Sequence, residues 1–235
     1  MRLILVYLSL CLLLACNKST EQVMIQIPLK PNITPLTYLA LGDSYTIGES
    51  VAQKLSFPYQ LASTLNTQNI TVATPKIIAK TGWTTSELQA AVKTENITQH
   101  FDFVTLLIGV NNQYSGHSAT SYRKAFKELL QTAISFAGGN KGHVFVVSIP
   151  DWGVTPFGKD SGKDIKVIAQ EIDAFNAINK QETLALDISY TDITPASRNA
   201  ATDLSLVAGD GLHPSGKMYG EWAAKVAAAV LVAFK

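Results

Sequence analysis

Three side chains of the sequence have the types that nucleophilic acyl transfer requires. Ser44 directly follows an apolar run and a Gly-Asp pair, and Asp210 and His213 lie three residues apart near the C-terminus. A serine hydroxyl becomes an effective nucleophile when a base removes its proton, and the histidine imidazole suits that task near neutral pH. The imidazole needs an acceptor at its other nitrogen, and a carboxylate three residues earlier, in a glycine-containing turn, can fold back onto the ring. The sequence therefore predicts Ser44 as nucleophile, His213 as base and Asp210 as its partner.

Acyl transfer also requires hydrogen-bond donors aimed at the oxyanion that develops on the substrate carbonyl. Two further positions come after apolar runs and can supply such donors: Gly82, in KTGWTT, and Asn111, in LLIGVNNQ. Gly82 has no Cβ, so its backbone can approach a substrate closely. We expect the oxyanion hole to consist of the backbone amides of Ser44 and Gly82 and the side-chain amide of Asn111.

The elements that must bring these residues together alternate between strand-like and helix-like segments. The runs FVTLLIGV and VFVVSIP are apolar on both faces, which is typical of strands that helices cover on both sides. Apolar residues spaced three or four apart indicate helices between the strands. The expected strands are 37–41, 70–78, 103–110, 144–149 and 185–190. The expected helices are one between Ser118 and Gly139, one through 165–178, one from Pro214 to the C-terminus, and shorter ones after Pro58 and after Thr84.

This alternation predicts an α/β fold in a single domain of residues 36–235. Strands and helices of these lengths imply a mostly parallel five-stranded sheet between two helix layers, a three-layer α/β/α sandwich. In such sheets, ligands bind beyond the carboxyl ends of the strands. Because Ser44, Gly82 and Asn111 each follow a predicted strand, we expect them to meet Asp210 and His213 at that edge.

Four sequence blocks resemble those of the SGNH/GDSL hydrolase superfamily, in the same order: GDSY, Gly82, GVNN and DGLH. The members of this superfamily are serine esterases and lipases with a flavodoxin-like fold. The resemblance runs from about residue 36 to the C-terminus. It implies the same roles for Ser44, Gly82, Asn111, Asp210 and His213, and no cofactor. In one departure, Asn112 stands where the third block commonly has aspartate, which leaves the fine tuning of the site open.

Aromatic residues in the predicted loops of this edge are candidates for lining a substrate pocket, with ordinary core packing as the alternative. The longest loop, 150–164, is the expected substrate-selecting element. The candidate pocket residues are Tyr45, Trp83, Tyr114, Trp152 and Phe157.

Simpler roles compete with the catalytic ones. Ser44 could merely cap the helix that follows it, and Asp43 is expected to stabilise the turn rather than to carry protons. Among the other histidines, His100 and His143 flank predicted strands and are expected to be structural. His117 follows Asn111 closely in a loop and remains the alternative base, although no acidic residue adjoins it in the sequence.

The first residues of the chain have a different character from the rest. Arg2 and the apolar run of residues 3–14 are typical of a signal peptide, and the run is too short to span a bilayer as a helix. LLAC at residues 13–16 resembles a bacterial lipobox, which predicts a signal peptide at 1–15, lipid on Cys16 and a tether at 16–35. The protein is then expected to be exported and anchored by lipid in the bacterial cell envelope, on the outer membrane or a periplasmic face. A plain secretory signal followed by a chance cysteine is the alternative.

The composition excludes some classes of partner. The 235 residues are 47% hydrophobic and 16% charged, with a formal net charge of +1 and no basic stripe, so nucleic acid is not an expected partner. No set of histidines, cysteines and carboxylates has metal-ligand spacing, so we predict no metal site.

We therefore expect a serine hydrolase that cleaves carboxylic esters with short or medium acyl groups through an acyl-enzyme. Its substrate would be a small-molecule, lipid or acylated-sugar ester. Two related activities remain open, carbohydrate O-deacetylation and lysophospholipid or thioester hydrolysis. The alternative from another class is a surface lipoprotein that binds glycan without catalysis.

Overall fold

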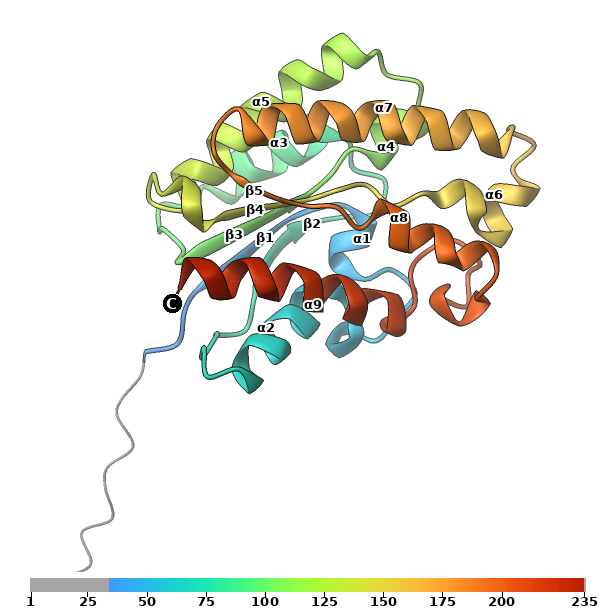
Figure 1. Cartoon of the computed structure of the whole chain (residues 1–235). Helices are drawn as coiled ribbons and strands as arrows, with labels where there is room; N and C mark the ends of the chain where they lie inside the picture. The colour runs from blue at the N-terminus through green and yellow to red at the C-terminus, as the bar shows by residue number, and fades with distance from the viewer. Residues whose placement is uncertain (1–33, 235) are drawn as a thin grey trace, which may run out of the picture. The chain divides into compact units, whose positions relative to one another are not determined.

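The structure is a computed structural model that describes residues 34–234. Five strands form one sheet in the order β2-β1-β3-β4-β5, and every pair of neighbours is parallel. Helices cover both faces of the sheet, so the predicted three-layer α/β/α sandwich is confirmed (Figure 1). The strands are β1 Tyr38–Gly42, β2 Lys76–Ala79, β3 Phe103–Leu107, β4 Val144–Val147 and β5 Ser189–Thr191.

The two helix layers are built from different parts of the chain. α2 and α9 pack on each other beneath the sheet, whereas α3, α5 and α7 lie above it (Figure 1). Shorter helices lie at the carboxyl ends of the strands. The helices are α1 Ser44–Ile47, α2 Phe57–Thr67, α3 Thr85–Glu95, α4 Val110–Tyr114, α5 Ala119–Phe136, α6 Pro156–Asp160, α7 Ile165–Leu184, α8 Thr194–Ser197 and α9 Gly216–Ala233.

The three central strands are buried along their whole length because their sequences have no polar face. Every residue of β1, β3 and β4 is buried. The one hydroxyl-bearing pair inside these strands is internally satisfied, since Tyr38 Oη lies 2.8 Å from Thr105 Oγ1. Continuous apolar runs of this kind predict central strands of a parallel sheet, and β1, β3 and β4 are found there.

The two edge strands are shorter than predicted. In the segment 70–78, only Lys76 onward joins the sheet, together with an isolated bridge between Val72 and Leu36. Pro75 separates the two contacts, because proline has no amide hydrogen for the ladder. The prediction of 185–190 is also displaced. Residues 185–187 close α7, with Asp187 in the left-handed region at φ 57°, and β5 starts only at Ser189.

The prediction of a loop at 150–164 is wrong in part, because this segment contains the helix α6 and a 3₁₀ turn at Trp152–Val154. Local side chains start both elements. Asp151 Oδ1 accepts from the Gly153 amide at 2.9 Å, and Thr155 Oγ1 accepts from the Gly158 amide at 3.1 Å. Thr155 followed by Pro156 is a strong signal for a helix start, since proline at the first helical position needs no amide partner.

The predicted signal peptide, the lipidated Cys16 and nearly all of the tether 16–35 lie outside the described residues. Within residues 34–234, no helix is both long and apolar enough to cross a membrane.

Candidate active site

Parallel register places three of the predicted site residues at one edge of the sheet. Gly42, the last residue of β1, is aligned with Ala79 of β2 and with Leu107 of β3. Ser44, Gly82 and Asn111 come after these three strand ends, each within four residues. Strand pairing therefore brings together residues that lie far apart in the sequence.

Ser44 begins α1 directly behind β1. The alternative role for Ser44 as a helix cap is wrong, because Asp43 is the capping residue and accepts from the Tyr45 amide at 3.0 Å. The turn needs glycine before it, since a Cβ on Gly42 would lie 2.0 Å from Thr46 Oγ1 and 2.4 Å from the Leu107 carbonyl oxygen. The backbone at Gly42 is therefore closely packed where β1 passes into α1, and this packing fixes Ser44 at the start of the helix.

Asp43 is fully buried, and only one of its oxygens is hydrogen-bonded. Oδ1 accepts from the Tyr45 amide, whereas Oδ2 has no partner among the described residues. Burial raises the pKa of the Asp43 carboxyl from 3.8 to about 7, although the Tyr45 amide lowers it. Asp43 thus has the turn-stabilising contact that the sequence predicts, and it adds a buried group that titrates near neutrality.

Asp210 and His213 form a closed unit in the loop before α9. The His213 Nδ1 atom lies 2.6 Å from Asp210 Oδ2, and Asp210 Oδ1 accepts from the amides of Leu212 and His213 at 3.0 Å each. Gly211 permits this turn with φ 74°. At the base of the loop, the Ala208 amide donates to the His213 carbonyl oxygen at 2.7 Å.

The charge on Asp210 is stabilised where it faces the imidazole. Partial burial raises the pKa of Asp210, but the hydrogen bonds from His213, from Ser50 and from the loop amides outweigh it. Together they hold the pKa of this carboxyl well below its usual value. The carboxylate can therefore orient the ring and stabilise its protonated form at neutral pH.

One cavity is shared by four of the five predicted catalytic and oxyanion residues. It encloses about 630 Å³, the open space at its mouth included, and its lining includes Ser44, Gly82, Asn111 and His213. Asp210 is not part of the lining and lies behind the His213 ring. No hydrogen bond joins Ser44 to His213 in the described part of the chain.

Two of the predicted oxyanion donors are held by backbone conformation and by a contact between their segments. Asn111 lies in the first turn of α4, and its Nδ2 donates to the Trp83 carbonyl oxygen at 2.9 Å. That contact uses one of the two amide hydrogens and leaves the second free to face the cavity. Gly82 has φ 85°, and a Cβ there would meet nothing within 4 Å. The reason for glycine is thus the left-handed backbone rather than lack of space.

Asn112, the residue that departs from the common family pattern, lies outside the cavity. It is buried, its Oδ1 accepts from the Thr85 amide at 3.0 Å, and its Nδ2 donates to Thr85 Oγ1 at 3.0 Å. The same Nδ2 lies 3.1 Å from His117 Nδ1. Asn112 therefore ties α4 to the start of α3, close to the segment that carries Gly82.

The remaining histidines lie away from the cavity. His117, the alternative base, is exposed, does not line the cavity and has its Nδ1 at the Asn112 amide. His100 Nδ1 lies 3.1 Å from the Ser135 carbonyl oxygen, and the His143 ring stacks on Phe234.

Aromatic side chains form one wall of the cavity. The Tyr114 and Phe157 rings both pack against Trp152, at centroid distances of 5.3 and 6.1 Å. Trp152 itself is buried and donates from Nε1 to Gln113 Oε1 at 2.8 Å. Trp83 does not line the cavity, unlike the other predicted pocket residues Tyr45, Tyr114, Trp152 and Phe157. The remaining lining residues, which no sequence pattern singles out, are Thr81, Val110 and Leu212.

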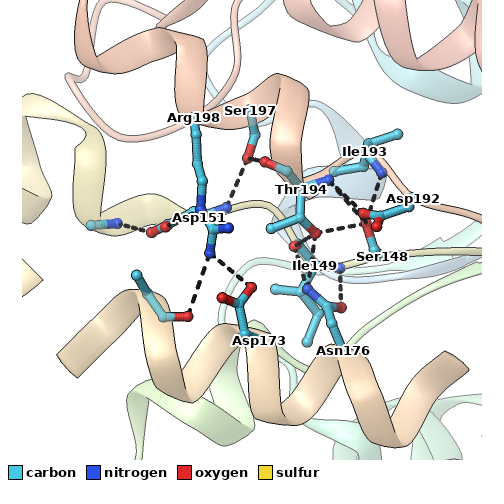
Figure 2. A network of polar contacts seen from close by, with 12 residues as sticks. Ser148, Ile149, Asp151, Asp173, Asn176, Asp192, Ile193, Thr194, Ser197 and Arg198 are labelled. Carbon is cyan, nitrogen blue, oxygen red and sulfur yellow. Dashed lines mark hydrogen bonds and ion pairs between the residues drawn. The ribbon is translucent and has the colours of Figure 1, made fainter. Parts of the chain in front are cut away.

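A polar network holds Asp151, the residue before Trp152 in the sequence (Figure 2). Arg198 Nε donates to Asp151 Oδ2 at 2.9 Å, and Arg198 Nη2 donates to Asp173 Oδ1 at 2.8 Å. The Asp151 amide donates to Ser197 Oγ at 3.0 Å. Because Asp151 also caps the turn that starts at Trp152, these contacts hold the backbone that carries the Trp152 ring.

The comparisons with known proteins agree with this arrangement. The sequence matches the model of the GDSL-like Lipase/Acylhydrolase family over residues 40–220, so the chain belongs to this family. Family and fold together define a hydrolase of the SGNH type. No protein of curated function matches the sequence.

Solved structures share the fold at low sequence identity. A lipase/acylhydrolase from Enterococcus faecalis is 18% identical with a TM-score of 0.64, over 83% of this chain and 95% of that one. A lipase from a goat rumen metagenome is 20% identical with a TM-score of 0.64, over 83% of this chain and 97% of that one. An acetyl xylan esterase from Geobacillus stearothermophilus is 16% identical with a TM-score of 0.62, over 83% of this chain and 94% of that one.

Replacing Asp43 with asparagine should change how stability depends on pH. The carboxyl ionises near 3.8 when unfolded and near 7 when folded, so between these values the folded state holds a proton that the unfolded state has lost. The free energy of unfolding of the wild type should therefore fall as pH rises through this interval, by at most about 1.4 kcal/mol per pH unit.

The asparagine amide does not titrate, keeps the acceptor for Tyr45 and supplies a hydrogen where Oδ2 has no partner among the described residues. The stability of Asp43→Asn relative to the wild type should thus increase between about pH 5 and about pH 7.5, as measured by urea unfolding. Parallel stability curves for the two proteins would show that Asp43 does not ionise in this range.

Proposed function

We propose that this protein is a serine hydrolase that cleaves carboxylic esters through an acyl-enzyme, with Ser44 as nucleophile and the Asp210–His213 pair as base. The observation that carries the proposal is the carboxylate-bound imidazole of His213, which lines the same cavity as Ser44. Because Nδ1 is engaged by Asp210, Nε2 is the nitrogen available to the serine. Catalytic hydrogen bonds often shorten only in the complex with substrate, so the proposal requires Ser44 and His213 to close on each other there.

The proposed reaction uses these positions in turn. His213 Nε2 takes the Ser44 hydroxyl proton as Oγ attacks the ester carbonyl carbon, and Asp210 stabilises the imidazolium that forms. The amides of Ser44 and Gly82 and the free Asn111 N–H bind the oxyanion. His213 then protonates the leaving alcohol, and the acyl-enzyme remains. A water molecule, deprotonated by His213, releases the acid and restores Ser44.

The cavity supports short or medium acyl groups. Its lining is mainly apolar, with Val110, Tyr114, Trp152 and Leu212 available to pack on hydrocarbon. Its volume of about 630 Å³, open space at the mouth included, can hold a short or medium acyl group together with the alcohol part of the ester.

Carbohydrate O-deacetylation is the second candidate, and two exposed rings favour it. Tyr114 and Phe157 line the cavity and are 47% and 38% exposed, with Lys163 Nζ over one face of the Tyr114 ring at 4.5 Å from its centroid. Flat apolar ring faces of this kind can pack on the apolar faces of sugars. Two of the structural neighbours are acetyl xylan esterases. At this low sequence identity, the similarity shows a shared fold and not a shared substrate.

We also propose that residues 1–15 direct export, and that lipid on Cys16 anchors the protein in the cell envelope. Two or more acyl chains on that cysteine would anchor it stably, whereas one chain binds a membrane only marginally. Mass spectrometry of the N-terminal peptide from membrane fractions tests this, and an unmodified Cys16 would refute it.

A serine-directed phosphonate should label the purified protein at Ser44. The activated hydroxyl attacks phosphorus as it would attack a carbonyl and displaces the leaving group of the phosphonate, and the adduct is located by peptide mass spectrometry. Ser44→Ala should abolish both labelling and turnover while the protein stays folded, as judged by circular dichroism. A wild-type protein that takes no label and hydrolyses no ester would instead support the non-catalytic glycan-binding alternative.

A panel of esters should separate the candidate substrates. We expect nitrophenyl esters of short acids to be hydrolysed much faster than those of long acids or long-chain triglycerides, because a long chain that shares the cavity with the alcohol part would have to extend into solvent. Faster release of acetate from acetylated xylo-oligosaccharides than from nitrophenyl acetate would favour the deacetylase. A preference for triglycerides would contradict the size argument, and Ser44→Ala supplies the blank.

Asn111→Ala should lower kcat by about 10²–10³ with little change in KM, as expected on loss of one oxyanion donor. The substitution also frees the Trp83 carbonyl oxygen, so thermal unfolding must be followed in parallel. Asn140→Ala serves as the control, since Asn140 lies between α5 and β4, outside the cavity lining. If the kcat of Asn111→Ala stays within about threefold of the wild type, Asn111 does not bind the oxyanion.

A further inference from the structure

Ser50 has a backbone conformation that its residue type disfavours. Its φ is 64°, in the left-handed region where a Cβ crowds the following carbonyl. Three other non-glycine residues of the described chain have positive φ, and all are of types that tolerate it: Asn69, Asn96 and Asp187. Ser50 is the one serine among them. Strain of this kind tends to be stored where the surrounding structure uses the side chain.

The side chain of Ser50 reaches the carboxylate of the proposed relay. Ser50 Oγ donates to Asp210 Oδ2 at 2.7 Å, across 160 residues of sequence. That oxygen is the one that lies 2.6 Å from His213 Nδ1. Ser50 therefore binds the same carboxylate oxygen as the imidazole does.

The backbone amides of its own loop bind Asp210 at Oδ1, so a contact from a separate element acts on the other oxygen, Oδ2. The Asp210 side chain is 30% exposed. A donor from a separate element fixes the direction of the carboxylate, and with it the direction in which the imidazole points. Among the described residues outside the Asp210 loop, Ser50 is the one whose side chain donates a hydrogen bond to this carboxylate.

The turn that carries Ser50 also links the other parts of the site. It directly follows α1, and the amides of Gly48 and Glu49 donate to the Ser44 carbonyl oxygen at 3.1 Å each. Glu49 Oε2 accepts a hydrogen bond from Thr81 Oγ1, next to Gly82. The turn thus connects the helix of the nucleophile with the oxyanion segment and with Asp210.

We propose that Ser50 is a positioning residue for the Asp210–His213 pair, and that its strained backbone is retained because it delivers the hydroxyl to Asp210. Ser50 does not line the cavity, so it acts through Asp210 rather than on the substrate. The kinetic part of this inference rests on the proposed function, whereas the geometric part does not.

The kinetic test compares Ser50→Gly with Ser50→Ala. Glycine removes both the hydroxyl and the backbone strain, whereas alanine removes only the hydroxyl. In both variants kcat should fall by about tenfold, as expected for loss of a hydrogen bond to a charged group, with KM nearly unchanged. The melting temperature of Ser50→Gly should stay close to that of the wild type, because relief of the backbone strain offsets the lost hydrogen bond, so an inactive but folded variant excludes simple unfolding.

The matched control is Asn69→Gly. Asn69 has φ 65° and follows α2, outside the cavity lining, so this variant relieves a similar backbone conformation without removing a contact to the site. Its kcat should equal that of the wild type.

A second readout is independent of turnover. The proton in the short contact between His213 Nδ1 and Asp210 should give a far-downfield ¹H NMR signal, which Asp210→Ala abolishes and so assigns. Ser50→Gly should shift or broaden this signal, whereas Asn69→Gly should leave it unchanged.

The outcomes separate the two proposals. If Ser50→Gly keeps kcat within about twofold, or loses kcat with the proton signal unmoved, Ser50 does not position the pair. If the wild type hydrolyses no ester and takes no phosphonate, the proposed function fails, and the NMR comparison still decides whether Ser50 holds Asp210.

Discussion

The site depends on the parallel pairing of β1 with both of its neighbours. Gly42 stands level with Ala79 and with Leu107, so the chain leaves three adjacent strands at nearly the same height. The segments beyond these strand ends are then forced into one region. A shift of one residue in either pairing would turn the side chains of a strand toward the opposite helix layer. Since both faces of β1 and β3 are apolar, the close packing of side chains of particular shapes is what opposes the shift. Packing of the core therefore enforces the register on which the site relies.

The sheet alone does not place Asp210 and His213, which arrive on a loop from the far end of the chain. Their position depends on polar contacts: the turn amides that bind Asp210 Oδ1, the backbone pair of Ala208 and His213, and the hydroxyl of Ser50. The polar contacts of Arg198 do the same for the wall that carries Trp152. Strand pairing thus sets the coarse geometry of the site, and hydrogen bonds between distant loops set the fine geometry.

Prediction from sequence succeeded where one local pattern determines the structure. The uninterrupted apolar runs of β1, β3 and β4 have one interpretation in an alternating α/β chain, and the helix predicted between Ser118 and Gly139 is found as α5. It failed at β2 and β5, where a proline and the close of a helix shorten the strand, and at 150–164, where two local caps start short elements. Asp151 and Thr155 are visible signals for those turns.

Other features have no local signal in the sequence. Contacts such as Ser50 with Asp210, or Arg198 with Asp151 and Asp173, join residues too far apart in the sequence for any repeating pattern to reveal them. Trp83 was expected in the cavity because it lies in a loop, but its carbonyl oxygen rather than its ring takes part, as the acceptor for Asn111.

The contacts of Asn112 show what an aspartate at this position would change. The amide gives hydrogens both to Thr85 Oγ1 and toward His117 Nδ1. A carboxylate has none to give, so the Thr85 hydroxyl would have to turn and His117 would have to present a proton instead. An aspartate at 112 would thus make the contact between α4 and α3 depend on which ring nitrogen of His117 holds the proton, whereas the asparagine present here supplies both hydrogens itself.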